Sequence, residues 1–423
     1  MSVVAYHWIH MAAQKVPDRV AIEGPERSLT YAELSQAAIA RVGALQGTKR
    51  VGIALPAGED FVIALHTCLL AGAAAVPIDL RLSDAERRQR MAQAEVVVSE
   101  PLAPDGSVWP TSSLGADPEV AVMHTSGTTA APKPVTLTYG NFLASALGSA
   151  VALGLDPAER WLCPMPLTHV GGLSIPIRSA IYSTTAVLHG RFDTEAVLND
   201  LMDPGRRITL VSLVPTMLAR LLDAGLQSPP TLRWALLGGG PIAPALLERA
   251  EGAGVPVAPT YGMTEACSQI ATFGWPLPGV DYYTSEGELR VRGPIVAAGA
   301  TDERGWLHTG DLATFDEHGR LVITGRKSDT IVSGGENVAP AEVEAVLLEH
   351  PAVADAAVHP RSDPEWGEAV VATVVLRDGL DVTPEELRAH CAARLAGFKV
   401  PKAIGLTDKL PRTPSGKLLR RQL

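Results

Sequence analysis

The sequence predicts an α/β protein with a large N-terminal domain of mainly parallel sheets layered with helices, followed by a small mobile α+β domain. The chain has 423 residues, too many for one ordinary core, and 46% of them are hydrophobic. Short apolar runs typical of buried strands alternate with helical segments up to about residue 290, as in parallel sheets covered on both faces. This pattern changes near 319–326.

The elements of the large domain, residues 1–324, are expected in a regular order. Thr30 caps a helix within 29–46. The apolar stretch 61–80 is interrupted by polar residues and Pro77, so it predicts a buried helix running into a strand and not a membrane span. Further strands are expected at 51–55, 96–98 and 120–123, and further helices at 141–153, 194–203, 215–225 and 243–253.

The small domain is expected at 330–423, after a hinge at 325–329. Pro340 precedes a predicted helix at 341–349. A β-rich stretch at 370–376 follows, and Thr383 and Glu386 then form the capping-box pattern of another helix. About 100 residues are enough for a separate core.

Charge and cysteine usage narrow the function classes. The net charge of −10 argues against a nucleic-acid binder held by bulk attraction, so local groups must hold any phosphate. The four cysteines lie far apart without metal-type spacing, which indicates reduced thiols, and Cys267 is interpreted as a packed small residue. With no signal-peptide pattern at 1–18, a soluble cytoplasmic protein without membrane insertion is expected. A homo-oligomer is possible but not indicated.

A polar loop after the strand at 120–123 is suited to a polyphosphate. Its hydroxyls, freed backbone N–H groups and one lysine can wrap phosphate oxygens, and a helix is expected to follow it. It lacks the GxxxxGK[ST] spacing, which disfavours a simple P-loop NTPase, and a polar surface loop is the alternative. The candidate residues are Thr125, Ser126, Gly127, Thr128, Thr129 and Lys133.

Two further loops suit the base and the metal of a nucleotide. Tyr261 can stack on a base, and Glu265 can hold the Mg²⁺ that accompanies ATP. The bare backbone of Gly238, Gly239, Gly240 and Pro241 allows a flat ring to approach closely. An ordinary strand end and an ordinary strand-to-helix turn are the alternatives.

Candidates for the sugar and for a passing ligand come later in the chain. Asp311 and Arg326 are suitable partners for ribose hydroxyls, although a surface salt bridge explains them equally. The adjacent Gly334 and Gly335 permit close passage of a ligand, or simply a tight turn.

The C-terminal segment 399–423 reverses the charge of the chain, with seven basic residues against one acid. Such a run is usually a solvated face. Here the proline- and glycine-bounded loop 411–417 presents Lys417, which also fits a lid over an anionic nucleotide.

Together these loops resemble the acyl-adenylate-forming superfamily of acyl-CoA synthetases, adenylation domains and luciferases. The strings TSGTT…PK, YGMTE, HTGDL, GRKSD…GGENVAPAEVE and PRTPSGK stand in that family's order over nearly the whole chain. The resemblance implies that a carboxylate attacks the α-phosphate of Mg·ATP to give acyl-AMP, and that the thiol of coenzyme A then displaces AMP after the small domain rotates.

The resemblance also implies roles for individual residues. Lys417 would steady the carboxylate and the α-phosphate, Glu265 would hold Mg²⁺, and Ser328 would be the pivot. Asp311 and Arg326 would grip the ribose, and Gly334 with Gly335 would line the approach of CoA. The phosphates would lie on Thr125–Thr129 and Lys133, and the adenine between Gly238–Pro241 and the segment Tyr261, Gly262, Met263 and Thr264. Ala130 and Pro134 depart from the family pattern, where glycines are usual.

Two strings look closest to the o-succinylbenzoate–CoA ligases of menaquinone synthesis. One is PMPLTHVGGLS, which contributes His169, Gly171, Leu173 and Ser174, and the other is GMTEACSQI, which contributes Ser268 and Gln269. By this resemblance His169 lies where the acyl and nucleotide pockets meet, and a capped turn histidine is the alternative. The acid has a second carboxylate that must be recognised, for which Ser268 and Gln269 can supply donors and Arg178 a charge. For Arg178, a surface or structural ion pair is the alternative.

Three other functions stay open at this point. Another aryl- or acyl-CoA ligase would share the mechanism and differ in its pocket. A stand-alone adenylation enzyme would load a carrier protein in place of CoA. A non-catalytic nucleotide sensor would be expected to lack residues such as Lys417, Glu265, Asp311 and Arg326, which are all present.

Overall fold

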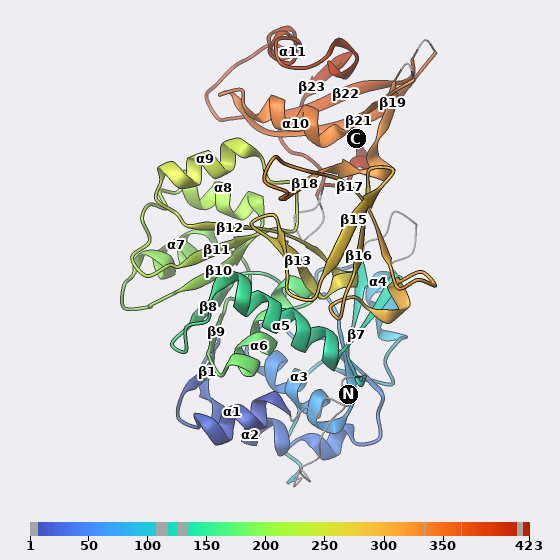
Figure 1. The fold of residues 1–423 in the computed structure, drawn as a ribbon. Helices are drawn as coiled ribbons and strands as arrows, with labels where there is room; N and C mark the ends of the chain where they lie inside the picture. The colour runs from blue at the N-terminus through green and yellow to red at the C-terminus, as the bar shows by residue number, and fades with distance from the viewer. Residues whose placement is uncertain (1–6, 107–116, 126–132, 334, 365, 413–417) are drawn as a thin grey trace. The chain divides into compact units, whose positions relative to one another are not determined.

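A computed structural model describes residues 7–106, 117–125, 133–333, 335–364, 366–412 and 418–423 (Figure 1). The chain divides into two compact units. One comprises Met1–Gly239, Ala253–Asp281 and Val291–Leu307, and the other Gly240–Gly252, Tyr282–Arg290 and His308–Leu423. Residues 308–324 thus group with the C-terminal residues, and the hinge at 325–329 stays a prediction.

The first unit contains a sheet that, within the described residues, has nine strands in the order β14-β13-β12-β11-β10-β8-β9-β1-β2. Its central pairs from β12 to β1 are parallel, and antiparallel strands flank them. The strands are β1 (Val20–Glu23), β2 (Ser28–Thr30), β8 (Arg160–Cys163), β9 (Thr185–Leu188), β10 (Leu210–Leu213), β11 (Trp234–Leu237), β12 (Val257–Met263), β13 (Ser268–Thr272) and β14 (Trp275–Pro276).

A second sheet of the same unit has the described order β5-β3-β4-β6-β7 and is parallel except for its last pair. Its strands are β3 (Arg50–Ile53), β4 (Ala74–Pro77), β5 (Val96–Val98), β6 (Glu119–Thr125) and β7 (Lys133–Thr138). Parallel sheets layered with helices confirm the predicted fold class. One detail is wrong, because β7 and not a helix follows the polar loop. In the described sheet β7 is an edge strand, the position in which a residue such as Pro134 is tolerated.

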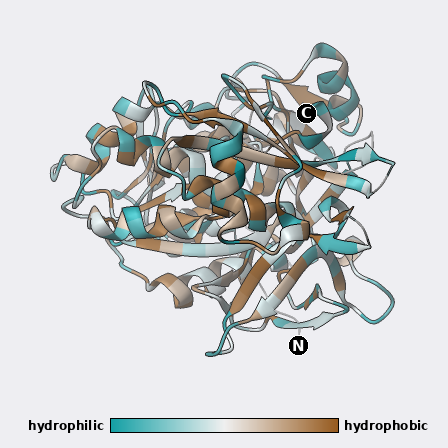
Figure 2. Ribbon diagram, turned by 90° about the horizontal axis from the view of Figure 1, so that it is seen from above, coloured by the Kyte–Doolittle hydropathy of each residue, from teal (hydrophilic) through white to brown (hydrophobic). Residues whose placement is uncertain are grey.

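Helices join the two sheets into one hydrophobic core. Helix α3 packs on β3 and β4, α6 packs on β8 and β9, and α1 and α2 connect them. In Figure 2 the apolar residues gather in the interior of the fold and the outer loops are largely polar. The helices of this unit are α1 (Trp8–Lys15), α2 (Tyr31–Ile39), α3 (Glu59–Ala71), α4 (Asp84–Met91), α5 (Tyr139–Leu153), α6 (Val170–Tyr182), α7 (Thr194–Met202) and α8 (Pro215–Asp223).

Local signals account for several helix starts. The Thr30 hydroxyl accepts a hydrogen bond from the Glu33 backbone N–H, and the Glu33 carboxylate accepts one from the Thr30 backbone N–H. This pair of bonds is the capping box that begins α2. Thr383 and Glu386 do the same at α11 (Pro384–Ala392), as the sequence predicts. The segment 61–80 is confirmed as buried α3 running into β4.

The second unit has a core of its own. A described sheet of order β15-β16-β17-β18, whose last pair is antiparallel, precedes an α+β part with the strand order β20-β19-β22-β21, in which β23 also pairs with β22. Its elements are α9 (Pro244–Gly252), β15 (Asp281–Ser285), β16 (Glu288–Arg292), β17 (Leu307–Phe315), β18 (Leu321–Arg326), β19 (Ile331–Ser333), β20 (Glu336–Val338), α10 (Pro340–Leu348), β21 (Val353–Asp363), β22 (Gly367–Leu376), α11 and β23 (Ala403–Leu406).

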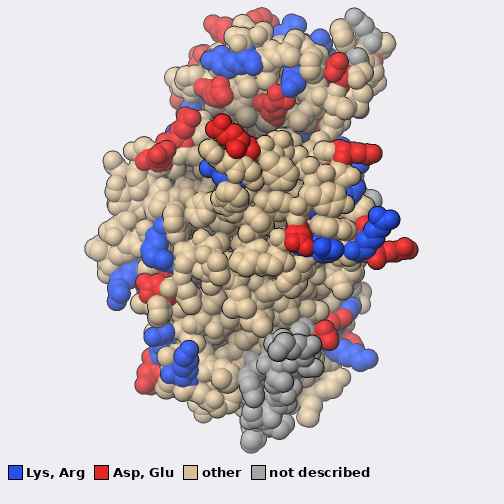
Figure 3. Space-filling model, viewed as in Figure 1, with Lys and Arg blue, Asp and Glu red and all other residues tan. Residues whose placement is uncertain are grey.

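Two surface properties follow from the described residues. None of their helices is long and apolar enough to cross a membrane. On the face drawn in Figure 3, basic and acidic side chains are interspersed, so that face presents no extended field of one sign.

Candidate active site

Four segments of the first unit, three of which hold predicted site residues, follow neighbouring parallel strands. The chain leaves β8 toward β9 on one side, and leaves β10 toward β11 on the other. Ligands of open α/β sheets bind outside the carboxyl ends of the strands, where the strand order reverses in this way. The segments there are Pro164–His169 after β8, Val214 after β10, Gly238–Gly239 after β11 and Thr264–Glu265 after β12.

The hairpin of β12 and β13 carries the predicted base and metal residues. Tyr261, Gly262 and Met263 end β12, and Thr264 and Glu265 lie in the short 3₁₀ turn that follows. A Cβ on Gly262 would lie 1.6 Å from the Ser268 carbonyl oxygen, so only glycine fits this bulged pair. No described residue forms an ion pair with Glu265, whose backbone carbonyl accepts from Ala297 at 2.8 Å.

The glycines after β11 have a structural reason of their own. A Cβ on Gly238 would lie 2.8 Å from the Thr260 carbonyl oxygen, so the close approach here is made by the neighbouring strand β12. Gly239 has a φ of +78°, which glycine adopts without strain. Gly239, Gly240 and Pro241 are exposed. Their proposed place beside the adenine stays a prediction.

His169 precedes α6 but does not cap that helix with its side chain, so the capped-turn alternative is wrong. Burial lowers the pKa of its imidazole; Asp79 opposes this shift, whereas Arg81 and Arg90 add to it. The Asp79 carboxylate is itself held by Arg81 at 2.6 Å. His169 is therefore a neutral imidazole at pH 7, able to donate or accept one hydrogen bond.

The residues of α6 that follow His169 mostly have structural roles in packing or in hydrogen bonds within the helix. A Cβ on Gly172 would lie 2.2 Å from the Pro166 carbonyl oxygen, while Gly171 only meets the flexible end of Met165. Leu173 is fully buried in the main core. The buried Ser174 donates its hydroxyl to the Val170 carbonyl at 2.6 Å, within its own helix.

Arg178, two turns after His169, is buried without an acidic partner. Its side chain is 2% exposed, and within the described residues it forms no ion pair. One terminal nitrogen donates to Ser145 Oγ at 2.9 Å, the guanidinium carbon lies 5.7 Å from the Trp161 ring centroid, and Nε has no partner. Burial lowers the pKa of Arg178. The surface or structural ion pair considered from sequence is therefore wrong.

Ser268 and Gln269 begin β13. Ser268 has a φ of +90° and follows Cys267, which has a φ of +49°. Gln269 is 1% exposed; its Nε2 donates to Thr272 Oγ1 at 2.9 Å and its Oε1 has no partner. In this structure one of the two amide hydrogens of Gln269 is thus already bonded to Thr272. Cys267 is a buried free thiol whose pKa burial raises to about 12, as expected of a packed residue.

The predicted phosphate loop is bounded by described strands. Thr125 ends β6 and pairs with Lys133, which begins β7 and is exposed. Ser126, Gly127, Thr128, Thr129 and Ala130 lie outside the described residues. Next to Thr125, His124 is buried with neither ring nitrogen partnered, and burial lowers the pKa of its imidazole to about 4.

In the second unit, the two predicted ribose residues face each other across adjacent strands. Asp311 on β17 is paired in register with Arg326 on β18, and Arg326 Nε donates to the Asp311 carboxylate at 2.7 Å. Asp311 is 5% exposed and the Arg326 side chain 39%. The structure brings the pair together as an ion pair, and their contact with a ribose stays a prediction.

The remaining predicted residues of this unit are partly described. Ser328 is exposed, and its hydroxyl donates to the Asp329 carboxylate at 2.9 Å. Gly335 has a φ of +85° where β19 turns into β20, so the tight-turn interpretation is confirmed for it. Gly334 and Lys417 lie outside the described residues.

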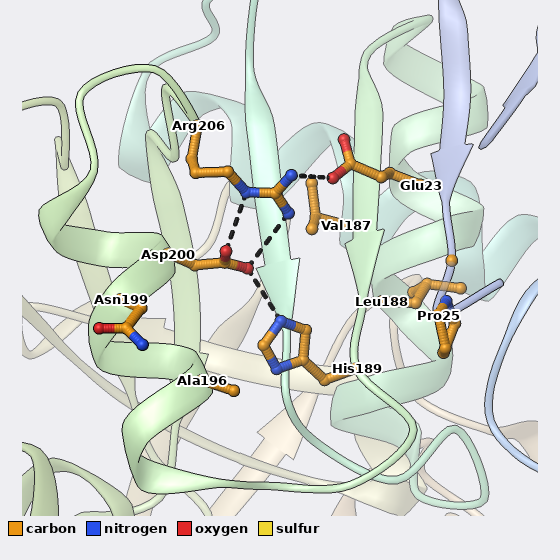
Figure 4. A pocket seen from close by; sticks show the side chains of 10 residues that line it. Glu23, Pro25, Val187, Leu188, His189, Ala196, Asn199, Asp200 and Arg206 are labelled. Atoms are coloured by element: carbon orange, nitrogen blue, oxygen red, sulfur yellow. Dashed lines mark hydrogen bonds and ion pairs between the residues drawn. The ribbon is translucent and has the colours of Figure 1, made fainter. Parts of the chain in front are cut away.

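A cavity of about 330 Å³ lies elsewhere in the first unit, at the ends of β1 and β9 beside α7 (Figure 4). Asp200 receives bonds from His189 at 2.9 Å and Arg206 at 2.8 Å, and Glu23 is bound by Arg160 at 2.5 Å and by Arg206. These charges neutralise one another, and none of the predicted site residues lines the cavity. It is not the site that the motifs predict.

Comparison with known proteins assigns the family. The profile described as "AMP-binding enzyme" matches residues 9–100 and 99–300, and "AMP-binding enzyme C-terminal domain" matches 342–417. The chain belongs to the AMP-binding enzyme family. This result confirms the adenylate-forming resemblance of the motifs.

Relatives of this AMP-binding enzyme are similar over their full length. It is 38% identical to the 2-succinylbenzoate–CoA ligase of Bacillus licheniformis, over 99% of each chain. Among solved structures, it matches the o-succinylbenzoate CoA synthetase of Bacillus subtilis in complex with the acyl-adenylate OSB-AMP, with a TM-score of 0.89, 36% identity and 99% and 98% coverage. The same synthetase with ATP and magnesium matches with a TM-score of 0.89 and 35% identity over all of both chains.

Sequence reasoning missed the residues that surround the predicted ones. Ser145 on α5 bonds both Arg178 and the Cys267 carbonyl, and Asp79, Arg81 and Arg90 set the charge near His169. These residues are ordinary serines and charged residues in helices and turns. No local motif marks them, because their partners are far away in the sequence.

Proposed function

We propose that this AMP-binding enzyme is an ATP-dependent carboxylate–CoA ligase that converts 2-succinylbenzoate (o-succinylbenzoate) to its CoA thioester in menaquinone biosynthesis. The full-length match to relatives named 2-succinylbenzoate–CoA ligase supports the reaction. The buried, acid-free Arg178 is the structural observation that supports this acid. We further propose a cytoplasmic location, where ATP and CoA are available.

The reaction has two half-reactions. One carboxylate oxygen attacks the α-phosphorus of ATP, the bond to the β-phosphate oxygen breaks, and pyrophosphate leaves. The CoA sulfur then attacks the acyl carbon, loses its proton, and AMP leaves with the electron pair of the acyl–oxygen bond. Little covalent chemistry falls to the protein, which positions the reactants and neutralises charge.

Each predicted residue has a task in this scheme. Lys417 and the loop 125–133 balance the charge of the phosphates. His169, a neutral imidazole, offers a hydrogen bond to the acyl or phosphate oxygens without adding a charge. Asp311 and Arg326 hold the ribose, and Gly334 with Gly335 admit the thiol after rotation about Ser328.

Glu265 fits the magnesium that accompanies ATP. Carboxylate oxygens are preferred ligands of Mg²⁺, which is commonly bound by one or two carboxylates together with substrate phosphates and water. No described residue neutralises Glu265, and the described residues contain no cluster of three acidic, histidine or cysteine side chains that could hold a metal alone. This arrangement suits a metal that arrives with the nucleotide, whose chemistry there is to offset phosphate charge.

Arg178 fits the carboxylate that is recognised and not activated. A buried charge without a partner costs several kcal/mol, which a protein recovers when an ion of opposite sign binds. The guanidinium also presents Nε as a free donor, suited to a carboxylate oxygen. A ligase for a monocarboxylic acid would have no use for this charge.

A panel of carboxylates scored by pyrophosphate release tests the proposal. It contains 2-succinylbenzoate, benzoate, a medium-chain fatty acid and the amino acids, each with ATP and Mg²⁺, first with CoA and then without it. We expect the highest kcat/KM for 2-succinylbenzoate and a CoA thioester as product. A preference for benzoate or the fatty acid would contradict the acid, and acyl-AMP formation without transfer to CoA would contradict the ligase.

A further inference from the structure

Ser145 on α5 is a buried serine that joins two segments of the proposed acyl site. It is 1% exposed, and α5 packs against both α6 and β13. Its Oγ lies 2.7 Å from the Cys267 carbonyl oxygen and 2.9 Å from a terminal nitrogen of Arg178. Ser145 itself belongs to none of the motifs.

The Ser145 hydroxyl, the Cys267 carbonyl and the Arg178 guanidinium can share their hydrogen bonds in only one way. A carbonyl only accepts and a guanidinium only donates. The single hydroxyl hydrogen of Ser145 is therefore given to Cys267, and a lone pair of Oγ faces Arg178. The hydroxyl acts as an oriented acceptor whose direction is set by the Cys267 backbone.

That backbone is itself held in an unusual conformation. Cys267 and Ser268 have consecutive positive φ angles of +49° and +90°. Such residues cost about 1–3 kcal/mol each and persist where their surroundings hold them. The turn begins two residues after Glu265 in the sequence, so Ser145 ties the Arg178 side chain to the segment that carries the proposed metal ligand.

Arg178 depends on this tether to keep its direction. Among the described residues, Ser145 is its one hydrogen-bond partner; the Trp161 ring lies beside the guanidinium and Nε is unpartnered. Trp161 is itself fixed, because its Nε1 donates to Ser212 Oγ at 2.9 Å. A face contact to a ring allows the guanidinium to rotate in its plane, whereas the bond to Ser145 does not.

We propose that Ser145 is a positioning residue that aims the free donors of Arg178 at the second carboxylate of the substrate, and so sets the preference for a dicarboxylic acid. This inference rests on the proposed function. A purely structural buried serine would instead affect stability and all substrates alike.

The test compares Ser145→Ala with the wild type on two acids. One acid is 2-succinylbenzoate. The other is a monocarboxylate analogue, either 4-oxo-4-phenylbutanoate or 2-butanoylbenzoate, chosen because the wild type adenylates it. We expect Ser145→Ala to raise KM for 2-succinylbenzoate about 10-fold, the loss of one hydrogen bond to a charged group. We expect kcat, and both constants for the analogue, to change less than about twofold, because the analogue lacks the recognised carboxylate.

Two further variants make the test specific. Ser149→Ala removes another buried hydroxyl one turn along α5 that bonds neither Arg178 nor Cys267, and should leave both KM values unchanged. In an Arg178→Gln background, Ser145→Ala should raise KM by less than about twofold more, because its effect passes through Arg178. The melting temperature of each variant checks folding.

The outcomes separate this inference from the proposed function. An equal loss on both acids, no loss on either, or full additivity with Arg178→Gln overturns the role of Ser145 while the ligase activity stands. No turnover of 2-succinylbenzoate by the wild type overturns the proposed substrate, and this inference with it.

Discussion

Arg178 combines complete burial with a full charge and no acidic neighbour among the described residues. Its environment offers one serine hydroxyl and one indole ring, which offset only part of the cost of removing a guanidinium from water. Buried arginines that serve stability are normally paired. The burial of this residue therefore fits the proposed role in carboxylate binding better than a role in stability.

Replacing Arg178 should separate stability from affinity. We expect Arg178→Gln to raise KM for 2-succinylbenzoate about 10- to 100-fold, because a hydrogen bond to a charged group contributes about 1.5–3 kcal/mol. The same change should leave the melting temperature unchanged or higher, since it removes an unpaired buried charge. Steady-state kinetics and thermal melting measure the two effects. A lower melting temperature with unchanged KM would make Arg178 structural.

Buried histidines should make stability depend on pH. Burial lowers the pKa of His66 on α3 to about 4, against 6.5 when unfolded. The unfolded chain then binds the proton first, so this stability is full above pH 6.5 and is lost as pH falls toward 4. The shift is worth about 3 kcal/mol. We expect the melting temperature of His66→Gln to fall less than that of the wild type between pH 7 and 4.5.

An exposed histidine provides the control for this titration. His318→Gln, in the turn between β17 and β18, should keep the wild-type pH dependence. If His66→Gln retained the full wild-type slope, His66 would not be the titrating group.

At the scale of elements, the β12–β13 hairpin shows how backbone geometry positions chemistry. Gly262 and Gly238 are required by neighbouring carbonyl oxygens, and neither needs a ligand to explain it. From sequence, the bare backbone at Gly238 predicted close approach of a flat ring, whereas Gly262 was placed beside the adenine by the family resemblance alone. In the structure the group that closely approaches each glycine is a neighbouring strand, and the place of Gly238 beside the adenine stays a prediction.

Adding a methyl group to this hairpin should disrupt it. In Gly262→Ala the Cβ would lie 1.6 Å from the Ser268 carbonyl oxygen, which forces the bulge apart. We expect a loss of several kcal/mol in unfolding free energy, about 3 or more, and loss of ATP–pyrophosphate exchange. Gly252→Ala, with open space around its Cβ, should be neutral or slightly stabilising. A Gly262→Ala protein with normal stability and exchange would contradict the geometry.

Elements were predictable where the signal is local. The cap at Thr30, the capping box at Thr383 and the apolar run of α3 were identified from sequence because the residues that form them are near one another. The strand β7 was missed: Lys133 and Pro134 look like a loop, and only pairing with β6 makes them a strand. An edge strand tolerates such residues because one side of it needs no bonds.

At the scale of the whole molecule, the family match extends over both parts of the chain, from 9 to 300 and from 342 to 417. Two half-reactions then need different residues at different times. Lys417 lies outside the described residues, and its assignment to the first half-reaction is a prediction from the family motif.

Lys417→Ala should affect one half-reaction. Removing a charge that stabilises the adenylation transition state should lower ATP–pyrophosphate exchange about 100- to 1,000-fold. Thioester formation from supplied acyl-AMP and CoA should be largely spared. Lys409→Ala, an exposed lysine of the same basic segment, should change neither rate. Equal loss of both half-reactions would mean that Lys417 is structural or serves both.

By itself, the sequence determined the fold class, the family and the order of the candidate ligand-binding loops. Each of these rests on local patterns, namely periodicity, caps and short motifs. Such patterns can be recognised without knowing which distant residues make contact in the folded chain. Tertiary structure alone decided that Arg178 is buried without an acidic partner among the described residues, that Ser145 bonds both Arg178 and the Cys267 carbonyl, and that Thr260 fills the space beside Gly238. These facts depend on contacts between residues that the chain brings together from far apart, and burial and hydrogen bonding arise only when it folds.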